Sequence, residues 1–176
     1  MFKSLHMKLV LIMLLLIIAL MTIVGAFLFN GVIGFYMDEF YGQMKSVFSD
    51  AELVSDLRTA AASDADGRHI GEIIGAYTGY LGIDTGSRNY YILDGTTGAF
   101  LTGSDEESGK NLEITPNILS ALSGKEGSSS DWTADYMDVA LPISGGGNSY
   151  VVYIKDTRKA VDTLNAQLFM IILEAL

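Results

Sequence analysis

The sequence predicts an α+β fold, a five-stranded antiparallel sheet with long helices before and after it, preceded by a transmembrane helix. Three features predict it. An uncharged apolar run occupies residues 9–29. From Asn89 the apolar pattern changes from helical spacing to strand spacing. Helical spacing returns after residue 155 and ends in a second apolar run.

The first apolar run, Leu9–Phe29, is long enough to cross a membrane. It holds 21 residues without a charge, and a helix of that length spans roughly 30 Å, the thickness of the hydrocarbon core. Lys3 and Lys8 precede it and predict that residues 1–8 are cytoplasmic. The alternative is a signal peptide cleaved near Val24-Gly25-Ala26. The run exceeds the roughly 7–15 apolar residues of a signal peptide, which favours a retained anchor.

The sequence ends in a second apolar stretch, Leu168–Leu173 (LFMIIL), with no helix-stopping residue after it. This stretch is too short to span a membrane, so we expect residues 168–176 to be the start of a second, truncated transmembrane helix. Glu174 fits less easily, because a charge in a membrane is costly and usually faces a partner helix or water. The alternative is an amphipathic helix that packs on the domain's own core.

Residues 30–167 form the polar part of the chain and are expected to be one domain outside the cytoplasm. They contain 20 acidic and nine basic residues, a formal charge of −11. Such a domain repels nucleic acid, which is therefore not expected as a partner. Solubility alone is the simpler explanation of the acidity. The sequence has no cysteine, which excludes disulfides and thiolate metal sites.

Both ends of this domain carry apolar residues at heptad spacing. The first stripe predicts that the membrane helix continues to about Ala62. The same spacing is also typical of intramolecular core. Because both stripes adjoin predicted membrane segments, we expect a homodimer. The members of the first stripe are Ile33, Met37, Phe40, Met44, Val47, Ala51 and Val54, and those of the second are Val161, Leu164, Leu168, Ile171 and Ala175.

Between the stripes the pattern predicts a helix, two strands, a short helix and three more strands. The first helix covers about Arg68–Leu81, and the polar segment Ser104–Asn111 is expected to be a loop. The short helix has Pro116 at its start and Gly124 beyond its end. The expected strands are Asn89–Asp94, Ala99–Ser104, Gly127–Thr133, Asp135–Ile143 and Ser149–Ile154.

The strand order follows from apolar content. The first and fifth strands are the most apolar and are expected side by side in the middle of the sheet. Two hairpins then give the order 2-1-5-4-3, with turns at GTTG and SGGGN. Because the last strand leads into the C-terminal helix, a continuous helix from Lys155 to Leu173 is expected to follow it.

Three stretches carry a resemblance to a known family: YYILDGTTGAFLTGSDEESGKNL (Tyr90–Leu112), YMDVALPI (Tyr136–Ile143) and YVVYIKDTRKAVDTLNAQLFMIIL (Tyr150–Leu173). With them the chain resembles the extracytoplasmic PAS-like, or Cache, domain of bacterial membrane sensors, especially sensor histidine kinases. The resemblance implies that an external ligand shifts the last strand and the following helix. That helix would pass the shift through the membrane to a cytoplasmic kinase. This mechanism needs a two-state element biased by the ligand.

The predicted function is therefore the sensor and membrane-anchor region of a two-component sensor histidine kinase in the cell membrane. The alternatives are the sensor region of a methyl-accepting chemotaxis receptor or of a cyclic-dinucleotide enzyme, and a singly anchored envelope binding module without cytoplasmic output. No catalytic activity and no cofactor are expected, since the sequence lacks G-x-S-x-G, H-E-x-x-H, P-loop and G-x-G-x-x-G motifs.

A small-molecule pocket on one face of the sheet is the predicted binding site. Arg88 is the central candidate, because a guanidinium can hold a carboxylate with two hydrogen bonds. The alternative is that the aromatic residues are core and Arg88 is solvated. The acidic run Asp105–Glu107 could offer oxygen ligands to a divalent cation, but a solvated loop is the simpler interpretation and no metal is predicted. The remaining pocket candidates are Tyr77, Tyr80, Tyr91, Trp132, Tyr136 and Asp138.

Overall fold

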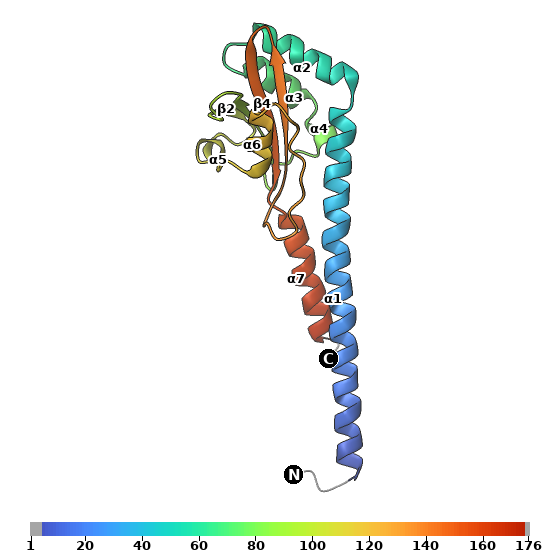
Figure 1. Cartoon of the computed structure of the whole chain (residues 1–176). Helices are drawn as coiled ribbons and strands as arrows, with labels where there is room; N and C mark the ends of the chain where they lie inside the picture. The colour runs from blue at the N-terminus through green and yellow to red at the C-terminus, as the bar shows by residue number, and fades with distance from the viewer. Residues whose placement is uncertain (1–4, 175–176) are drawn as a thin grey trace. The chain divides into compact units, whose positions relative to one another are not determined.

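The computed structural model describes residues 5–174 and has an α+β fold whose chain divides into two units (Figure 1). The first unit comprises the residues up to Tyr36 together with those from Lys159 onward. The second unit is Met37–Arg158 and contains the sheet. Lys3 and Ala175, which belong to the predicted cytoplasmic end and the second heptad stripe, lie outside the described residues.

The first unit consists of helix α7 and of helix α1 as far as Tyr36, and the rest of α1 belongs to the second unit. Helix α1, Leu5–Phe48, has an 18-residue stretch of mean hydropathy 3.1 in which no residue is buried, so its length and composition suit a membrane span. A signal sequence meets the same criterion. Helix α7, Lys159–Glu174, contacts α1 at the buried Gly25, where an added Cβ would lie 3.0 Å from Ile172 Cδ1. The contacting face of α7 thus includes Ile172, whereas Ile171 of the predicted stripe is 63% exposed.

The predicted continuous helix from the anchor to Ala62 is wrong, because α1 ends at Phe48 and α2, Ala51–Ser63, begins separately. Asp50 is extended, with φ −68° and ψ 115°, and its carboxylate accepts a hydrogen bond from the Glu52 N–H as an N-cap. Aspartate competes in this way with helix continuation. Met37, Phe40 and Met44 of the predicted stripe are buried inside their own unit.

The predicted helix Arg68–Leu81 is divided in two at Tyr77. Helix α3 covers Arg68–Ala76, and the single turn α4 covers Thr78–Leu81. Tyr77 has φ −98° and ψ 9°, outside the helical region, and Gly82 ends α4 in the left-handed conformation with φ 63°. The polar segment Ser104–Asn111, expected to be a loop, contains the short helix α5, Glu106–Lys110.

The sheet has four antiparallel strands rather than the predicted five. They are β1 (Arg88–Asp94), β2 (Phe100–Gly103), β3 (Met137–Gly145) and β4 (Asn148–Asp156). Their order is β2-β1-β4-β3, which is the predicted order with its third strand removed. The predicted central position of the last strand is therefore confirmed. The β3–β4 turn uses Gly146 and Gly147 at φ 59° and 90°, as a two-residue hairpin requires.

The missing strand is the segment Gly127–Thr133, which makes only one bridge, from Gly127 to Ala140 of β3. Beyond this bridge, the Asn117 side chain bonds the backbone N–H and carbonyl of Ser129, which a strand would use for sheet pairing. Its Oδ1 accepts from the Ser129 N–H at 3.0 Å, and its Nδ2 donates to the Ser129 carbonyl at 3.1 Å. Asp131 then accepts from the Thr133 N–H at 2.8 Å, a local turn that competes with sheet pairing.

The predicted helix Lys155–Leu173 begins only at Lys159, because β4 continues to Asp156. Lys155 and Asp156 still pair with residues of β1 on one side and of β3 on the other. Thr157 and Arg158 then link the strand to α7, and Arg158 has φ 58° in the left-handed region. A helix cannot start while these strand pairings persist.

The two faces of the sheet carry separate apolar layers. On one face Tyr91 and Tyr153 pack against α6, Pro116–Leu122, which matches the predicted short helix. On the other face Val139, Val152 and Ile154 are buried among residues that alternate with the first set. Helices α2 and α3 contact the strands on this second face, where an added Cβ at Gly71 would meet Ile92.

Candidate functional site

The predicted pocket residues do not converge on one site. Arg88 and Tyr91 lie on opposite faces of β1, because their positions differ by an odd number of residues. Asp138 lies on the Tyr91 face, opposite Lys155 in the β3–β4 pairing. Trp132 is 57% exposed in the segment before β3. The structure therefore distributes these side chains over several places, and their role in ligand binding stays a prediction.

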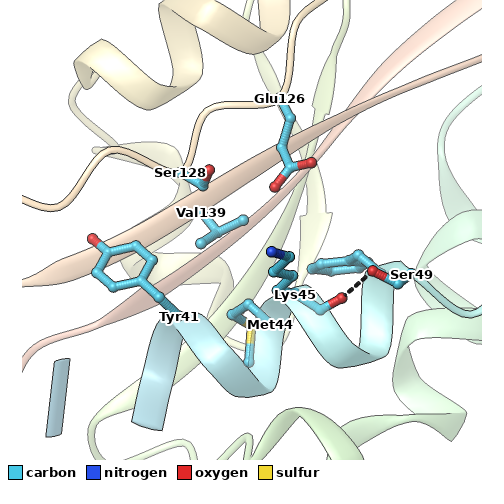
Figure 2. A pocket seen from close by; sticks show the side chains of 8 residues that line it. Tyr41, Met44, Lys45, Ser49, Glu126, Ser128 and Val139 are labelled. Atoms are coloured by element: carbon cyan, nitrogen blue, oxygen red, sulfur yellow. Dashed lines mark hydrogen bonds between the residues drawn. The ribbon is translucent and has the colours of Figure 1, made fainter. Parts of the chain in front are cut away.

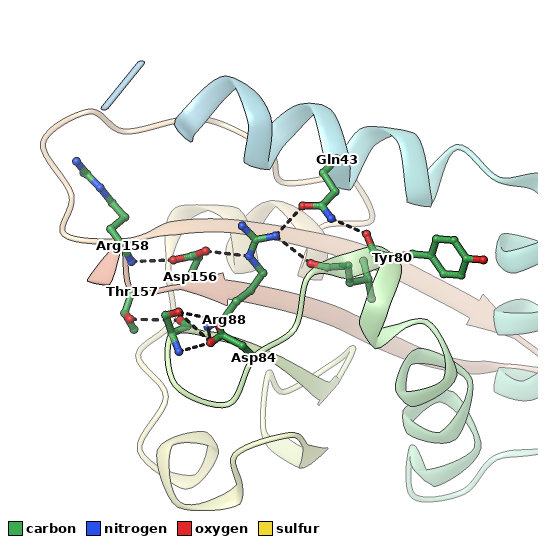
Figure 3. Close-up of polar contacts among 9 residues, drawn as sticks. Gln43, Tyr80, Asp84, Arg88, Asp156, Thr157 and Arg158 are labelled. Carbon is green, nitrogen blue, oxygen red and sulfur yellow. Dashed lines mark hydrogen bonds and ion pairs between the residues drawn. The ribbon is translucent and has the colours of Figure 1, made fainter. Parts of the chain in front are cut away.

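Arg88 is the centre of a polar network on the α1 face of the sheet (Figure 3). Its Nε donates to Asp156 Oδ2 at 2.8 Å, and its Nη1 donates to Gln43 Oε1 at 2.7 Å and to the Leu81 carbonyl at 3.0 Å. The guanidinium carbon also lies 4.9 Å from the ring centre of Phe40. Its Nε and Nη1 thus have internal partners, with only 15% of the side chain exposed.

The network joins three parts of the second unit that are distant in sequence. Gln43 on α1 also donates through Nε2 to the Tyr80 carbonyl at 2.6 Å. Asp156 at the end of β4 accepts the Arg158 N–H at 2.8 Å, and Arg158 donates through Nη1 to the Ala134 carbonyl at 2.5 Å. The left-handed backbone of Arg158 is thereby held by one bond from its own N–H and one from its side chain. One cluster consequently couples α1, β1 and the link before α7.

Asp138 belongs to a second polar cluster on the other face. Its Oδ2 accepts from Thr115 Oγ1 at 2.6 Å and from the Tyr153 hydroxyl at 3.1 Å, and its Oδ1 accepts from Asn117 Nδ2 at 2.6 Å. Burial and then the negative charge of Asp138 raise the pKa of Tyr153, which remains a hydrogen-bond donor. Thr115 is also the N-cap of α6, so this cluster fixes α6 to β3 and β4.

The remaining predicted residues lie near the surface. Lys155 Nζ lies 4.7 Å from the ring centre of Tyr136, a cation–π contact. Tyr77 and Tyr80 line a pocket of about 330 Å³ together with Ser46, Val47 and Asp50. The structure thus places these two predicted residues together in one pocket.

The acidic run Asp105–Glu107 caps a helix. Asp105 accepts from the Ser108 N–H at 3.1 Å as the N-cap of α5. A side-chain hydrogen bond with Ser108, followed by this backbone bond, holds the pKa of the Asp105 carboxyl below its ordinary value. Among residues 5–174 no three acidic or histidine side chains come together in a way that could hold a metal ion. Nothing in this part of the chain therefore supports the divalent-cation alternative.

A second pocket, of about 280 Å³, lies between the end of α1 and the sheet (Figure 2). Its floor is apolar and its rim is polar, with Lys45 and Glu126 as the charged members. The sequence does not indicate this pocket, because its walls come from α1, from the segment before β3 and from β3 itself. No local motif joins these segments, so only the folded chain brings them together. The lining residues are Tyr41, Met44, Lys45, Phe48, Ser49, Glu126, Ser128 and Val139.

No protein-family model, curated protein or solved structure matches this chain. The comparisons therefore assign no family and no function. The resemblance to PAS-like sensors therefore rests on the sequence stretches that carry it.

Proposed function

We propose that this chain is the extracytoplasmic sensor and membrane-anchor region of a two-component sensor histidine kinase. In this proposal residues 30–167 lie outside the cytoplasm, perceive an external signal and pass it on through α7. The observation that carries the proposal is the connection at the end of the sheet. The central strand β4 reaches α7 after only two residues, and α7 pairs with the apolar helix α1.

The surfaces of these two helices support a membrane location. In α1 the apolar residues from Leu9 to Ile18 are between 37% and 65% exposed. In α7, Phe169, Met170 and Leu173 are each about 60% exposed. Water would make so large a contiguous apolar surface costly, whereas lipid covers it at no such cost. The close contact at Gly25 suits helix pairing in lipid, where small residues let backbones approach.

The Arg88 network supplies a physical route for a signal. It bonds Gln43 of α1 to the β1–β4 pair and, through Asp156, to the backbone of Arg158 just before α7. A ligand that binds one arrangement of α1 better than another would shift the population of that arrangement. The change would reach α7 through this network, which is the coupling between sites that signalling requires.

Reading the coding sequence beyond the codon for Leu176 tests the proposal directly. We expect about 15 further apolar residues, completing a span of about 20. A helical linker, a histidine-bearing helix and an Asn- and Gly-rich ATP site should follow. A stop codon within a few residues would refute transmembrane signalling through α7. A methyl-accepting helical domain or a cyclic-dinucleotide domain would refute the kinase assignment.

A further inference from the structure

We propose that the turn Asp131–Ala134 docks on the membrane surface through Trp132, with the indole ring in the headgroup region of the leaflet that faces the domain. The partner is the lipid interface itself, not a dissolved ligand. This inference rests on the proposed function, because it requires α1 and α7 to be embedded in the membrane. It adds a third membrane contact to those of the two helices.

Trp132 lies at the tip of a hydrogen-bonded turn. The Ala134 N–H donates to the Asp131 carbonyl at 3.4 Å, which closes a four-residue turn with Trp132 at its second position. The Asp131 carboxylate also accepts from the Thr133 N–H at 2.8 Å and from the Thr133 hydroxyl at 2.6 Å. These bonds hold the backbone in place, while Trp132 is 57% exposed. The ring is thus available to a surface outside the domain.

The chemistry of indole suits a membrane interface. The ring is a large apolar body with one N–H donor. In the headgroup region the ring lies against acyl carbon, while the N–H still meets water or headgroup oxygens, and tryptophan is enriched there for this reason. The chain has a single tryptophan, and it lies in this turn.

Two hydrogen bonds place the segment that contains the turn beside both connections to the first unit. The Tyr41 hydroxyl donates to the Ser129 carbonyl at 3.4 Å. Tyr41 lies about one helical turn beyond Tyr36, where α1 passes from the first unit to the second. Arg158 Nη1 donates to the Ala134 carbonyl at 2.5 Å, and Arg158 is the last residue before α7. The segment therefore lies where the chain leaves the second unit for the proposed membrane helices.

The distance from this turn to the lipid is short enough to cross. From Lys159 to Leu168, where the apolar end of α7 begins, nine residues of helix rise about 14 Å. The headgroup region takes up roughly 5–8 Å of that height, so about 6–9 Å remain between the start of α7 and the headgroups. Tilting of the helix shortens this gap. Trp132 is two residues from Ala134, an extended reach of about 7 Å, and the indole adds its own length.

The charge around the turn favours zwitterionic lipid. A side-chain hydrogen bond from Thr133, followed by its backbone bond, lowers the pKa of the Asp131 carboxyl, so this group is ionised at neutral pH. Residues 30–167 carry a formal charge of −11 in addition. Anionic headgroups are repelled by such a surface, whereas choline and ethanolamine headgroups end in an ammonium group. We therefore expect docking to be stronger on phosphatidylcholine than on phosphatidylglycerol.

Intrinsic fluorescence of the full 176-residue chain in lipid nanodiscs tests the proposal. Because the chain has one tryptophan, its emission reports on Trp132 alone and no variant has to fold. The comparison is between phosphatidylcholine and the same lipid brominated on the acyl carbons nearest the glycerol. We expect bromination to reduce the emission at least about twofold, because bromine quenches a ring that lies at the interface. Mixing in phosphatidylglycerol should weaken this quenching.

Two relocated tryptophans, each in a Trp132→Phe background, calibrate the quenching. Phe27→Trp lies in the apolar run of α1, where residue 27 is 77% exposed, and should be quenched at least as strongly as Trp132. Thr96→Trp lies in the exposed β1–β2 turn and should not be quenched. That turn is at the opposite end of β1 from Arg88, which pairs with Asp156 next to the link before α7. Thermal unfolding equal to that of the unaltered chain would show that both variants are folded.

The outcomes separate this inference from the proposed function. Quenching of Trp132 together with an unquenched Thr96→Trp supports docking. Unquenched Trp132 with quenched Phe27→Trp overturns docking and leaves the membrane anchor in place. Trp132 that is shielded from aqueous acrylamide but not quenched by brominated lipid also overturns it, and assigns the turn to a contact between copies of the chain. If neither Trp132 nor Phe27→Trp is quenched, docking and the membrane location of α1 are both wrong. If Trp132 is quenched but the coding sequence lacks a signalling domain, docking holds and the kinase proposal fails.

Discussion

Replacing Arg88 by methionine is expected to destabilise the second unit by about 3–5 kcal/mol, the usual cost of removing one partner from a buried ion pair. Methionine keeps the aliphatic stem but leaves Asp156, whose side chain is 11% exposed, without its cationic partner. It also removes the donors that serve the Gln43 amide oxygen and the Leu81 carbonyl. Each unsatisfied buried acceptor adds to the cost.

The chain contains a matched control for this change. Arg68 Nε lies 2.9 Å from Asp66 Oδ2, nearly the same distance as in the Arg88–Asp156 pair, but these side chains are 80% and 56% exposed. Arg68→Met should therefore cost at most about 1 kcal/mol. Urea unfolding of the full chain in detergent micelles, followed by far-UV circular dichroism, gives both free energies.

A double-mutant cycle with Asp156→Asn isolates the pair itself. The asparagine keeps an oxygen that can accept the Arg158 N–H, so the link before α7 retains its bond. We expect a coupling free energy of roughly 0.5–3 kcal/mol between positions 88 and 156. If Arg88→Met costs no more than Arg68→Met, the network does not hold α1, β1 and β4 together, and the proposed signal route loses its basis.

Three further predictions concern acid stability, glycine packing and topology. Burial raises the pKa of Asp64, but backbone N–H groups, among them that of Ile70, outweigh it and lower the pKa. The stability that Asp64 contributes is thus fully present above about pH 4, the unfolded pKa, and is lost as the pH falls through the folded pKa. Asp64→Asn should therefore make the free energy of unfolding depend less steeply on pH between about pH 2 and 5. An unchanged slope would contradict this. Gly127→Ala should destabilise the protein by more than about 2 kcal/mol because the new Cβ clashes with Asn117. Gly42→Ala in α1, with no atom within 4 Å of the new Cβ, should instead stabilise it by roughly 0.5–1 kcal/mol. Equal effects of the two changes in thermal unfolding would refute the close contact between Gly127 and Asn117. An alkaline phosphatase fusion after residue 158 should be active in a bacterial host and one after residue 8 inactive, and the reverse would exclude an extracytoplasmic sheet.

Local signals in the sequence predicted most of the fold. Proline at the first position and glycine beyond the end located α6, and the apolar content of the last strand placed it at the centre of the sheet. The predictions were wrong where side chains compete with a helix or a sheet for backbone hydrogen bonds. The Asp50 carboxylate accepts the Glu52 N–H where the helix was expected to continue, and the Asn117 side chain accepts the Ser129 N–H where a strand was expected. Apolar spacing alone does not reveal such competition.

The candidate site was less predictable because its contacts are long-range. Arg88 meets Gln43 across 45 residues and Asp156 across 68 residues of sequence. The sequence identified Arg88 as an unusual side chain, but its partners depend on strand register and on where α1 ends. The pocket with Lys45 and Glu126 depends in addition on the single bridge at Gly127, within a segment predicted to be a full strand.

The pairing of β4 bears on which element of the proposed sensor moves. β4 pairs with seven residues of β1 and nine of β3, so a shift along its axis would break hydrogen bonds on both edges at once. Among the described residues, the hydrogen bonds from α1 to the sheet and its loops all use a side chain, such as Gln43 or Tyr41. Such bonds can be exchanged one at a time as side chains change rotamer. A small displacement of α1 is therefore less costly than one of β4. This favours α1, with Lys45 on the pocket wall, as the element that a ligand biases in the proposed sensor, and it makes Arg88 the side chain through which β4 and the link to α7 would respond.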